Sequence, residues 1–454
     1  MPEYDFISIG SGPAGYSSAL HAARLGAKVA VVEKGVIGGE CLNYACIPFK
    51  SLLHHVKLYY SIRKCIESGV CKGDVKLDVS SLNSFRSGIV SKLRGNLIKL
   101  MERNGIEIYY GEAYKIRDGS VYIKSDDGGK AIEGKNILLA LGSRPKLING
   151  VKVDGLRVLT SRDAVDLKNI QGELAVIGGG PVGIEVATLY NALGCRVSIF
   201  EMMNTLLPGL DRDISKRLEY NLRRMGIKVY TSKKILKVKT GDKVYVYLED
   251  GSRYSFDNIV LAIGRTPNTD NDLIRGIDLK LDEKGFIVVD GMQATNIKGI
   301  YAAGDVTGPP MLAHKAYFEG LNAAESIVNK RALRKPDYIP LTVYSYPEVF
   351  TIGLSEYGHD YLESVKIPLT VSGKAFSEDV KGLIKIVYSR RDRRVYGIHI
   401  IGDIASSLSE LSTVIVENSL KYDLIIDTLF PHPSYGEAIW EALAYLEGMS
   451  IHLD

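Results

Sequence analysis

The chain has 454 residues, of which 46% are hydrophobic and 24% are charged, and its net charge is +4. These values are typical of a globular protein of about three domains, and no concentrated basic block indicates a nucleic-acid partner. Because the sequence has no long apolar run and no secretory leader pattern, we expect no membrane span. Five cysteines are no secreted disulfide scaffold, which favours the cytoplasm.

The first predicted element is the apolar strand in YDFISIGSGPAG, which runs into the motif Gly10-x-Gly12-x-x-Gly15. A helix should open there, and the next strand, in LGAKVAVVE, ends at Glu33. The glycines allow a tight turn, approach of the backbone to a pyrophosphate, and close packing of helix on strand. The helix N-terminus offers N–H groups to the phosphates, and the acid reaches the ribose. The pattern predicts a dinucleotide site.

A cysteine pair follows in GGECLNYACIPFK, where Cys41 and Cys46 lie five positions apart. In a continuous helix their Cα atoms would be about 8–9 Å apart, whereas a disulfide needs less than about 7 Å. If the two are bonded, Cys41 must lie in an irregular segment before a helix that Pro48 helps to start. Cys46 would then lie near a helix N-terminus, which favours its thiolate. Two unrelated buried cysteines remain an alternative, while a zinc site would need more ligands.

The region 51–110 contains two stretches with apolar helical spacing, SLLHHVKLYYSI and SGIVSKLRGNLIKLMERNG, and should form long helices. Cys65 and Cys71 also lie there. Their spacing is poor for a metal site, so we interpret them as ordinary thiols.

The dinucleotide pattern occurs a second time, 168 residues later, with glycines at 178, 180 and 183. The downstream segment LGCRVSIFE places Glu201 at the position of Glu33, and Cys195 at the position of a small core residue. One such turn could lack a ligand, but two complete copies favour two nucleotide sites. Glu201 would repel a ribose 2′-phosphate, and no arginine follows it closely, so we predict NAD rather than NADP.

The cysteine segment resembles the redox-active segment GGTCxNxGCxPSK of the flavoprotein pyridine nucleotide-disulfide oxidoreductases. Within that family the chain is most similar to the dihydrolipoamide dehydrogenases, and the similarity covers essentially its whole length. The further motifs that carry it are ALGSRP (140–145), AIGRTPN (262–268), YAAGDVTGPPMLAHKA (301–316), VYSYPEVFTIGLSE (343–356) and HPSYGEA (432–438).

This resemblance implies an α/β fold with two Rossmann-like domains and a C-terminal α+β dimerisation domain. The implied domains are an FAD-binding domain in residues 1–147 and 268–335, an NAD-binding domain in 148–267, and a dimerisation domain in 336–454. The implied assembly is a homodimer, and no metal is expected.

The resemblance also implies cofactor contacts. Ala113 would lie against the adenine of FAD, Ser143 near the edge of the cofactor, Asp305 at the ribitol, and Lys50 would pair with Glu185 beside the flavin. The full implied set is Gly10, Gly12, Gly15, Glu33, Lys50, Ala113, Ser143, Asp305, Leu312, Ala313 and His314 for FAD, with Glu185 as the partner of Lys50 beside the flavin, and Gly178, Gly180, Pro181, Val182, Gly183 and Glu201 for NAD, with Gly264 as a further cofactor contact.

The implied reaction oxidises a lipoyl dithiol and reduces NAD⁺ through a Cys41–Cys46 redox disulfide. Cys41 would be the interchange thiol and Cys46 would face the flavin. His432 would act as the base, oriented by Glu437, and would complete the active site of the other subunit. Taken alone, a His–Pro turn would be structural, but a dithiol must lose protons, which a histidine paired with a carboxylate can accept.

Some positions depart from the family pattern, although none removes a reacting atom: Glu40 replaces Thr, Ala45 replaces Gly, Phe49 replaces Ser, Gly436 replaces Ser, and Pro181 stands where many relatives have a larger residue. The rival functions are another NAD(P)H-dependent disulfide or mercuric-type reductase, a flavin diaphorase or NADH oxidase, and a non-catalytic nucleotide-binding protein. The expected partners are free or protein-bound lipoyl dithiols, including a lipoyl-carrying multienzyme complex.

Overall fold

The computed structural model describes residues 1–126, 128–167 and 170–454. The chain forms two compact units, and each unit is assembled from separated segments of the sequence. The first unit comprises Met1–Leu52, Asp78–Lys146 and Gly264–Lys335, and the second comprises Leu53–Leu77, Leu147–Ile263 and Pro336–Asp454. The predicted α/β fold class is confirmed, whereas the four predicted domain limits remain predictions.

The first unit is organised around a seven-stranded sheet with the order β3-β2-β1-β6-β5-β4, in which β17 also pairs with β6. Its elements are β1 (Glu3–Ile9), α1 (Pro13–Arg24), β2 (Val29–Glu33), α2 (Gly39–Asn43), α4 (Val79–Arg103), β3 (Glu107–Tyr110), β4 (Glu112–Arg117), β5 (Ser120–Ser125), β6 (Gly128–Leu139), β7 (Ser143–Pro145), β16 (Arg265–Pro267), α8 (Asp272–Arg275), β17 (Ile300–Ala302), η1 (Asp305–Thr307) and α9 (Ala313–Val328).

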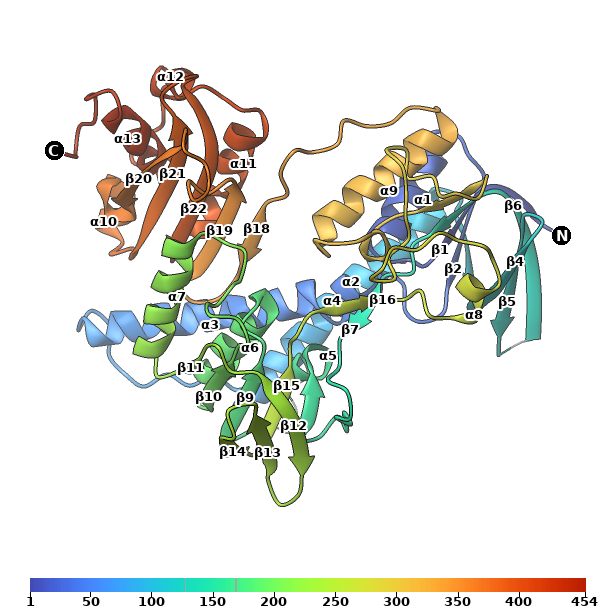
Figure 1. Ribbon diagram of the computed structural model, residues 1–454, viewed down its shortest axis with the longest axis horizontal. Helices are drawn as coiled ribbons and strands as arrows, with labels where there is room; N and C mark the ends of the chain where they lie inside the picture. Colours follow the sequence, from blue (N-terminus) through green and yellow to red (C-terminus); the bar gives the residue numbers. More distant parts are fainter. Residues whose placement is uncertain (127, 168–169) are drawn as a thin grey trace. The chain divides into compact units, whose positions relative to one another are not determined.

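Helices α1 and α9 lie side by side in this unit (Figure 1). Their close approach depends on Gly320, because a Cβ at this position would lie 2.5 Å from the carbonyl oxygen of Ala14. The two helices pack on the parallel part of the sheet, formed by β3, β2, β1, β6 and β17. This packing fixes the N-terminus of α1 at the carboxyl end of β1, where ligands bind in sheets of this kind.

Helix α3 (Cys46–Glu67) begins in the first unit and continues into the second. Together with α4 it confirms the two long helices predicted between residues 51 and 110. Asp78 caps α4 by accepting a hydrogen bond of 2.7 Å from the backbone nitrogen of Ser81. No described helix is long and apolar enough to cross a membrane.

The second unit contains a parallel sheet with the order β11-β10-β9-β15-β8 and a three-stranded antiparallel sheet, β12-β13-β14. The elements of this part are β8 (Val158–Thr160), α5 (Ser161–Ala164), β9 (Glu173–Ile177), α6 (Pro181–Ala192), β10 (Arg196–Phe200), α7 (Arg212–Arg224), β11 (Lys228–Tyr230), β12 (Ile235–Thr240), β13 (Val244–Leu248), β14 (Arg253–Phe256) and β15 (Asn258–Leu261).

The repeat predicted from the sequence is also a repeat of strand register. Phe6 pairs with Val29 between β1 and β2, and Leu174 pairs with Val197 between β9 and β10. Both residues of the second pair lie 168 positions after those of the first. Cys195, just before β10, is buried as predicted for a small core residue.

The C-terminal part of the second unit is built on an antiparallel five-stranded sheet with the order β18-β19-β22-β21-β20. Its elements are β18 (Leu341–Val343), β19 (Glu348–Gly353), β20 (Glu363–Pro368), η2 (Leu369–Val371), α10 (Gly373–Ser377), β21 (Gly382–Ser389), β22 (Arg394–Gly402), η3 (Ala405–Leu408), α11 (Ser409–Glu417), α12 (Tyr422–Ile426) and α13 (Glu437–Tyr445).

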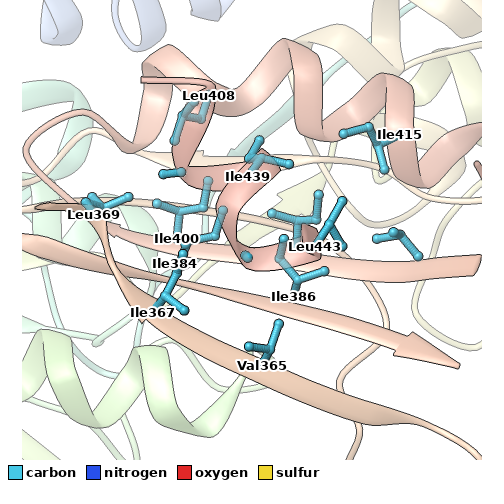
Figure 2. Packing of buried hydrophobic residues seen from close by; sticks show 14 of the residues in the cluster. Val365, Ile367, Leu369, Ile384, Ile386, Ile400, Leu408, Ile415, Ile439 and Leu443 are labelled. Carbon is cyan, nitrogen blue, oxygen red and sulfur yellow. The ribbon is translucent and has the colours of Figure 1, made fainter. Parts of the chain in front are cut away.

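One face of this sheet is covered by helices. Figure 2 shows Ile384 and Ile386 of β21 close to Ile439 and Leu443 of α13. All four side chains are fully buried, and the burial of each contributes about 1.5–3 kcal/mol to folding. This core fixes the start of α13, where Glu437 lies.

Candidate active site

The first glycine motif forms the turn between β1 and α1. Gly10 has a φ of +104°, and a Cβ there would lie 2.3 Å from the carbonyl oxygen of Ala140. A Cβ on Gly15 would lie 1.9 Å from the carbonyl oxygen of Gly10. In contrast, nothing lies within 4 Å of a Cβ placed on Gly12. Gly10 and Gly15 are therefore required by packing, whereas the space in front of Gly12 is open to a ligand.

Helix α1 begins at this turn without a side-chain cap and without an acidic residue in its first turn. Its free N–H groups and its positive dipole end therefore remain available to an anion. At the end of β2, the Glu33 carboxylate accepts hydrogen bonds from the backbone nitrogens of Ser11 (2.8 Å) and Gly35 (2.7 Å). The acid is thus held beside the turn, where a ribose would follow a bound pyrophosphate.

The second glycine motif reproduces this geometry between β9 and α6. Gly178 has a φ of +110°, and a Cβ on Gly183 would lie 2.0 Å from the carbonyl oxygen of Gly178. The buried Glu201 accepts hydrogen bonds of 2.7 Å from the backbone nitrogens of Gly179 and Met203. Gly180 faces open space, and α6 again lacks a cap. Both turns therefore fit dinucleotides.

The predicted redox cysteines lie on two helices with a break between them. Cys41 is in the short helix α2, and Cys46 is the first residue of α3. The predicted location of Cys46 at a helix N-terminus is confirmed. A Cβ on Gly39 would lie 2.6 Å from the Cα of Gly12, so α2 packs directly on the first phosphate-binding turn.

The two cysteines are present as thiols and not as a disulfide. A hydrogen bond with Cys46 and burial raise the pKa of Cys41, whereas the positive charge of Lys50 acts in the opposite direction. The two thiols therefore interact with each other across the break between α2 and α3.

The interpretation of Cys65 and Cys71 as ordinary thiols is wrong, because these two residues form a disulfide with a Cα–Cα distance of 5.2 Å. Cys65 lies in the last turn of α3 and Cys71 in the following loop. The loop folds back so that the backbone nitrogen of Cys71 donates a hydrogen bond to the carbonyl oxygen of Cys65. Sequence spacing does not reveal such a turn.

A polar cluster brings four separate segments of the first unit together. Ser143 donates a hydrogen bond of 2.5 Å to the carboxylate of Asp305, which supplies the partner that this acid needs. The Arg265 guanidinium donates to the Ser143 hydroxyl (2.6 Å) and carbonyl (2.9 Å). Arg265 also lies 3.8 Å from the carboxylates of both Asp305 and Glu40. The extra negative charge of Glu40 is thus balanced by an arginine.

Tyr16 of α1 and Tyr317 of α9 form a second polar contact in the first unit, with their hydroxyls 2.5 Å apart. Burial and this hydrogen bond raise the pKa of Tyr16, and nearby Cys41 and Cys46 add to the effect. Sequence analysis missed both tyrosines and Arg265. For two of them the available signal was position, since Tyr16 follows Gly15 of the first glycine motif and Arg265 follows Gly264 in AIGRTPN.

The remaining predicted cofactor residues lie at the ends of regular elements. Their locations are β4 for Ala113, the N-cap and first two residues of α9 for Leu312, Ala313 and His314, the first two residues of α6 for Pro181 and Val182, and the position before β16 for Gly264. Each would border a nucleotide by its backbone or small side chain, and these contacts remain predictions.

Lys50 and Glu185 belong to different compact units. Glu185 is buried in α6 and accepts a hydrogen bond of 2.9 Å from the backbone nitrogen of Tyr344. Lys50 lies on α3, and its positive charge acts to lower the pKa of Cys41. The predicted Lys50–Glu185 pair remains a prediction.

His432 and Glu437 form a histidine–carboxylate pair in the second unit. The Nδ1 atom of His432 lies 2.7 Å from Glu437 Oε1, and the backbone nitrogen of Ser434 donates a 2.6 Å hydrogen bond to Glu437 Oε2. Burial acts to raise the pKa of Glu437, but the hydrogen bonds from Ser434 and His432 lower it overall. The His432 side chain is 72% exposed. Its ring is therefore oriented by the carboxylate and accessible to a partner molecule.

Comparison with known proteins identifies the family. The sequence pattern of the family described as pyridine nucleotide-disulphide oxidoreductase matches residues 4–320, and that of the family's dimerisation domain matches residues 339–443. The chain belongs to this family. Its cofactors are therefore FAD and NAD, as predicted, and the dimerisation domain supports a homodimer.

Several relatives of the oxidoreductase are named dihydrolipoyl dehydrogenase. The chain is 37% identical to that of Buchnera aphidicola, with 98% of this chain and 96% of the relative covered. It is 33% identical to that of Bacillus subtilis over 99% and 98% of the two chains. The crystal structure of LpdA from Mycobacterium tuberculosis superposes with a TM-score of 0.89 at 25% identity and covers 98% of this chain and all of that one. The predicted family and enzyme class are confirmed.

Among the described residues, no group of three or more His, Cys, Asp or Glu side chains is arranged to hold a metal ion.

Proposed function

We propose that this oxidoreductase is an FAD-dependent dihydrolipoamide dehydrogenase, which oxidises a lipoyl dithiol to the cyclic disulfide and reduces NAD⁺ to NADH. The observation that carries the proposal is the interaction between the Cys41 thiol of α2 and the Cys46 thiol at the start of α3, with α2 packed on the first phosphate-binding turn. The whole-length similarity to dihydrolipoyl dehydrogenases supports the substrate class.

The first turn would hold FAD through the N-terminus of α1 and Glu33, with Ser143 and Asp305 toward the other end of the cofactor. The second turn would hold NAD through α6 and Glu201, whose negative charge disfavours a 2′-phosphate. When bound, FAD and NAD supply the two-electron oxidation that returns the cysteine dithiol to a disulfide.

The residues of the chain carry the thiol chemistry. A thiolate of the lipoyl dithiol attacks Cys41 in the oxidised pair, so that a mixed disulfide forms and Cys46 leaves as a thiolate. The second substrate thiolate then attacks the substrate sulfur that is bonded to Cys41. The cyclic disulfide closes, and Cys41 is released as a thiolate. The substrate loses two electrons and the pair gains them. The reduced pair described above is the product of this half-reaction.

His432 would accept the protons that the substrate thiols lose. Its Nδ1 faces Glu437, so Nε2 is the atom available to a thiol. The carboxylate stabilises the imidazolium that forms, because the lowered pKa of Glu437 keeps this carboxylate charged. A lipoyl group on a carrier protein, including one in a multienzyme complex, could be presented to this exposed residue.

The test is NADH formation by the FAD-loaded protein from dihydrolipoamide and NAD⁺, followed by nicotinamide absorbance. We expect formation of NADH with NAD⁺, little with NADP⁺, and loss to background in Cys41→Ser. Cys195→Ser is the matched control, because this buried thiol lies outside the site, and it should retain the activity.

A second assay separates the rival functions. NADH-driven reduction of a dye does not need the thiols, so Cys41→Ser should retain it. If the wild-type protein reduces dyes but forms no NADH from dihydrolipoamide, it is a diaphorase or a reductase for another disulfide, and the proposal fails.

A further inference from the structure

The Cys65–Cys71 disulfide is separate from the candidate active site. Cys46 begins α3 and Cys65 lies in its last turn, so the two cysteine pairs stand at opposite ends of one 22-residue helix. The mechanism proposed above uses only the first pair. The second therefore needs its own explanation.

The disulfide lies in an exposed part of the chain. Residues 67–74 are all exposed, and Val70 retains 82% of its accessible surface. Cys71 belongs to this exposed segment, whereas Cys65 is partly buried. A thiolate from solution can therefore approach the Cys71 sulfur without displacing core residues.

Opening of the bond would not release the end of α3, because other contacts within the second unit hold the helix. The Lys57 ammonium lies 2.9 Å from a carboxylate oxygen of the buried Glu348. The Tyr60 ring stacks on Tyr346 with a centroid distance of 4.6 Å, and the Lys64 ammonium lies 3.3 Å from Asp403. The bond can therefore open and close as a local event confined to the loop before α4.

We propose that Cys65–Cys71 is a second thiol–disulfide exchange site, which reacts with small dithiols and cyclic disulfides of the lipoyl class. It is accessible, it joins residues only six positions apart, and the partner class is the one that the proposed function brings to the protein. In this respect the inference rests on the proposed function, but it uses no active-site residue and no nucleotide.

The exchange is balanced without a further reactant. A dithiol thiolate attacks the Cys71 sulfur; a bond forms between them, the Cys65–Cys71 bond breaks, and Cys65 leaves as a thiolate. The second thiolate of the dithiol attacks the dithiol sulfur that is bonded to Cys71 and releases the Cys71 thiolate. The dithiol loses two electrons and two protons and becomes a cyclic disulfide, while the cysteines gain them and become thiols. The reverse reaction closes the bond.

The experiment is alkylation with peptide mass spectrometry on the full-length, FAD-loaded protein without NAD⁺. Wild type and the Cys41→Ser/Cys46→Ser variant are incubated with dihydrolipoamide or with oxidised lipoamide, quenched with acid and alkylated. We expect alkylation of Cys65 and Cys71 to rise from background to near completion with dihydrolipoamide and to return to background with lipoamide. Cys195 should not respond.

Two results would overturn the proposal. If Cys65 and Cys71 stay protected from alkylation until the protein is unfolded in the presence of reductant, their disulfide is purely structural. Cysteines that are alkylated under both conditions do not exchange.

In the single variants, oxidised lipoamide should add to Cys71 in Cys65→Ser more readily than to Cys65 in Cys71→Ser. Exchange without NADH formation in the wild type would refute the proposed function but leave this site.

Discussion

Arg265 compensates the negative charge that Glu40 places near the proposed FAD site. Glu40 follows Gly39, which packs on the first phosphate-binding turn, so its charge opposes a nearby pyrophosphate. The Arg265 side chain is only 20% exposed and is close to Glu40, Ser143 and Asp305 at once. It therefore offsets both carboxylates and holds Ser143 in place.

Replacement of this arginine should weaken retention of FAD. Arg265→Met removes hydrogen bonds from a charged donor, each contributing about 1.5–3 kcal/mol, so we expect FAD to bind about ten- to a hundredfold more weakly. Recovery of flavin fluorescence on dilution measures the release. Arg144→Met is the control, since Arg144 pairs with the exposed Asp270. Equal release from both variants would show that Arg265 has no special role.

Whether the role of a residue could be predicted from the sequence depended on how far along the chain its contact partners lie. Gly10 and Gly178 could be identified because a positive φ and close backbone packing exclude other residues at fixed local spacing. The contact of Glu40 with Arg265 could not, because it joins residues more than two hundred positions apart. Cys65 and Cys71 are close in sequence, but their bond depends on how the loop turns, which composition does not determine.

At the scale of elements, Lys385 joins α7 of the nucleotide-binding part to β21 of the C-terminal sheet within the second unit. The Lys385 side chain is 0% exposed, and its ammonium lies 2.7 Å from Asp211, 2.8 Å from Asp213 and 2.7 Å from Glu356. Asp211 also caps α7 by accepting a hydrogen bond from the backbone nitrogen of Asp213. One cation thus holds three carboxylates, which would otherwise repel one another.

Lys385→Met should lower the free energy of unfolding by about 3–5 kcal/mol, because it leaves the fully buried carboxylate of Asp211 without its lysine partner. Lys366→Met is the matched control. Lys366 also binds Asp213, at 2.6 Å, but it is 46% exposed, so we expect a change of about 1 kcal/mol or less. Urea denaturation of the two variants measures the difference, and equal losses would contradict the assigned role of Lys385.

The same cluster predicts how stability depends on pH. Burial opposes ionisation of Asp213, but hydrogen bonds from Lys366 and Lys385 prevail and lower its pKa from 3.8 to about 2. Because the folded pKa lies below the unfolded one, the contribution of Asp213 is fully present above its unfolded pKa. It is lost as the pH falls toward 2. The stability difference between wild type and Asp213→Asn should therefore shrink between pH 5 and pH 2 in denaturant titrations, and a constant difference would refute the assignment.

At the scale of the whole molecule, the chain uses one dinucleotide-binding design twice. The shift of 168 residues preserves the strand register, the two packed glycines and the backbone hydrogen bonds to the acid. This much could be predicted from sequence, since both copies are local in the chain. The histidine–carboxylate pair belongs to neither copy, and it lies in the part matched by the dimerisation domain.

If His432 serves the cysteine pair of the partner subunit, two inactive variants should complement each other. In a heterodimer of Cys41→Ser and His432→Ala chains, one site combines both substitutions and the other combines an intact Cys41 with an intact His432. The isolated heterodimer should therefore have about half of the wild-type activity, and an unfractionated mixture formed by random pairing about a quarter.

The measurement is NADH formation from dihydrolipoamide after the two tagged chains are co-expressed and the heterodimer is isolated. Separately purified homodimers, mixed without subunit exchange, are the control and should remain near background. If His432 instead served the cysteines of its own chain, every site in the heterodimer would carry one substitution, and no activity would return. Recovery of activity would assign the base to the opposite subunit and make dimer formation a requirement of the chemistry itself.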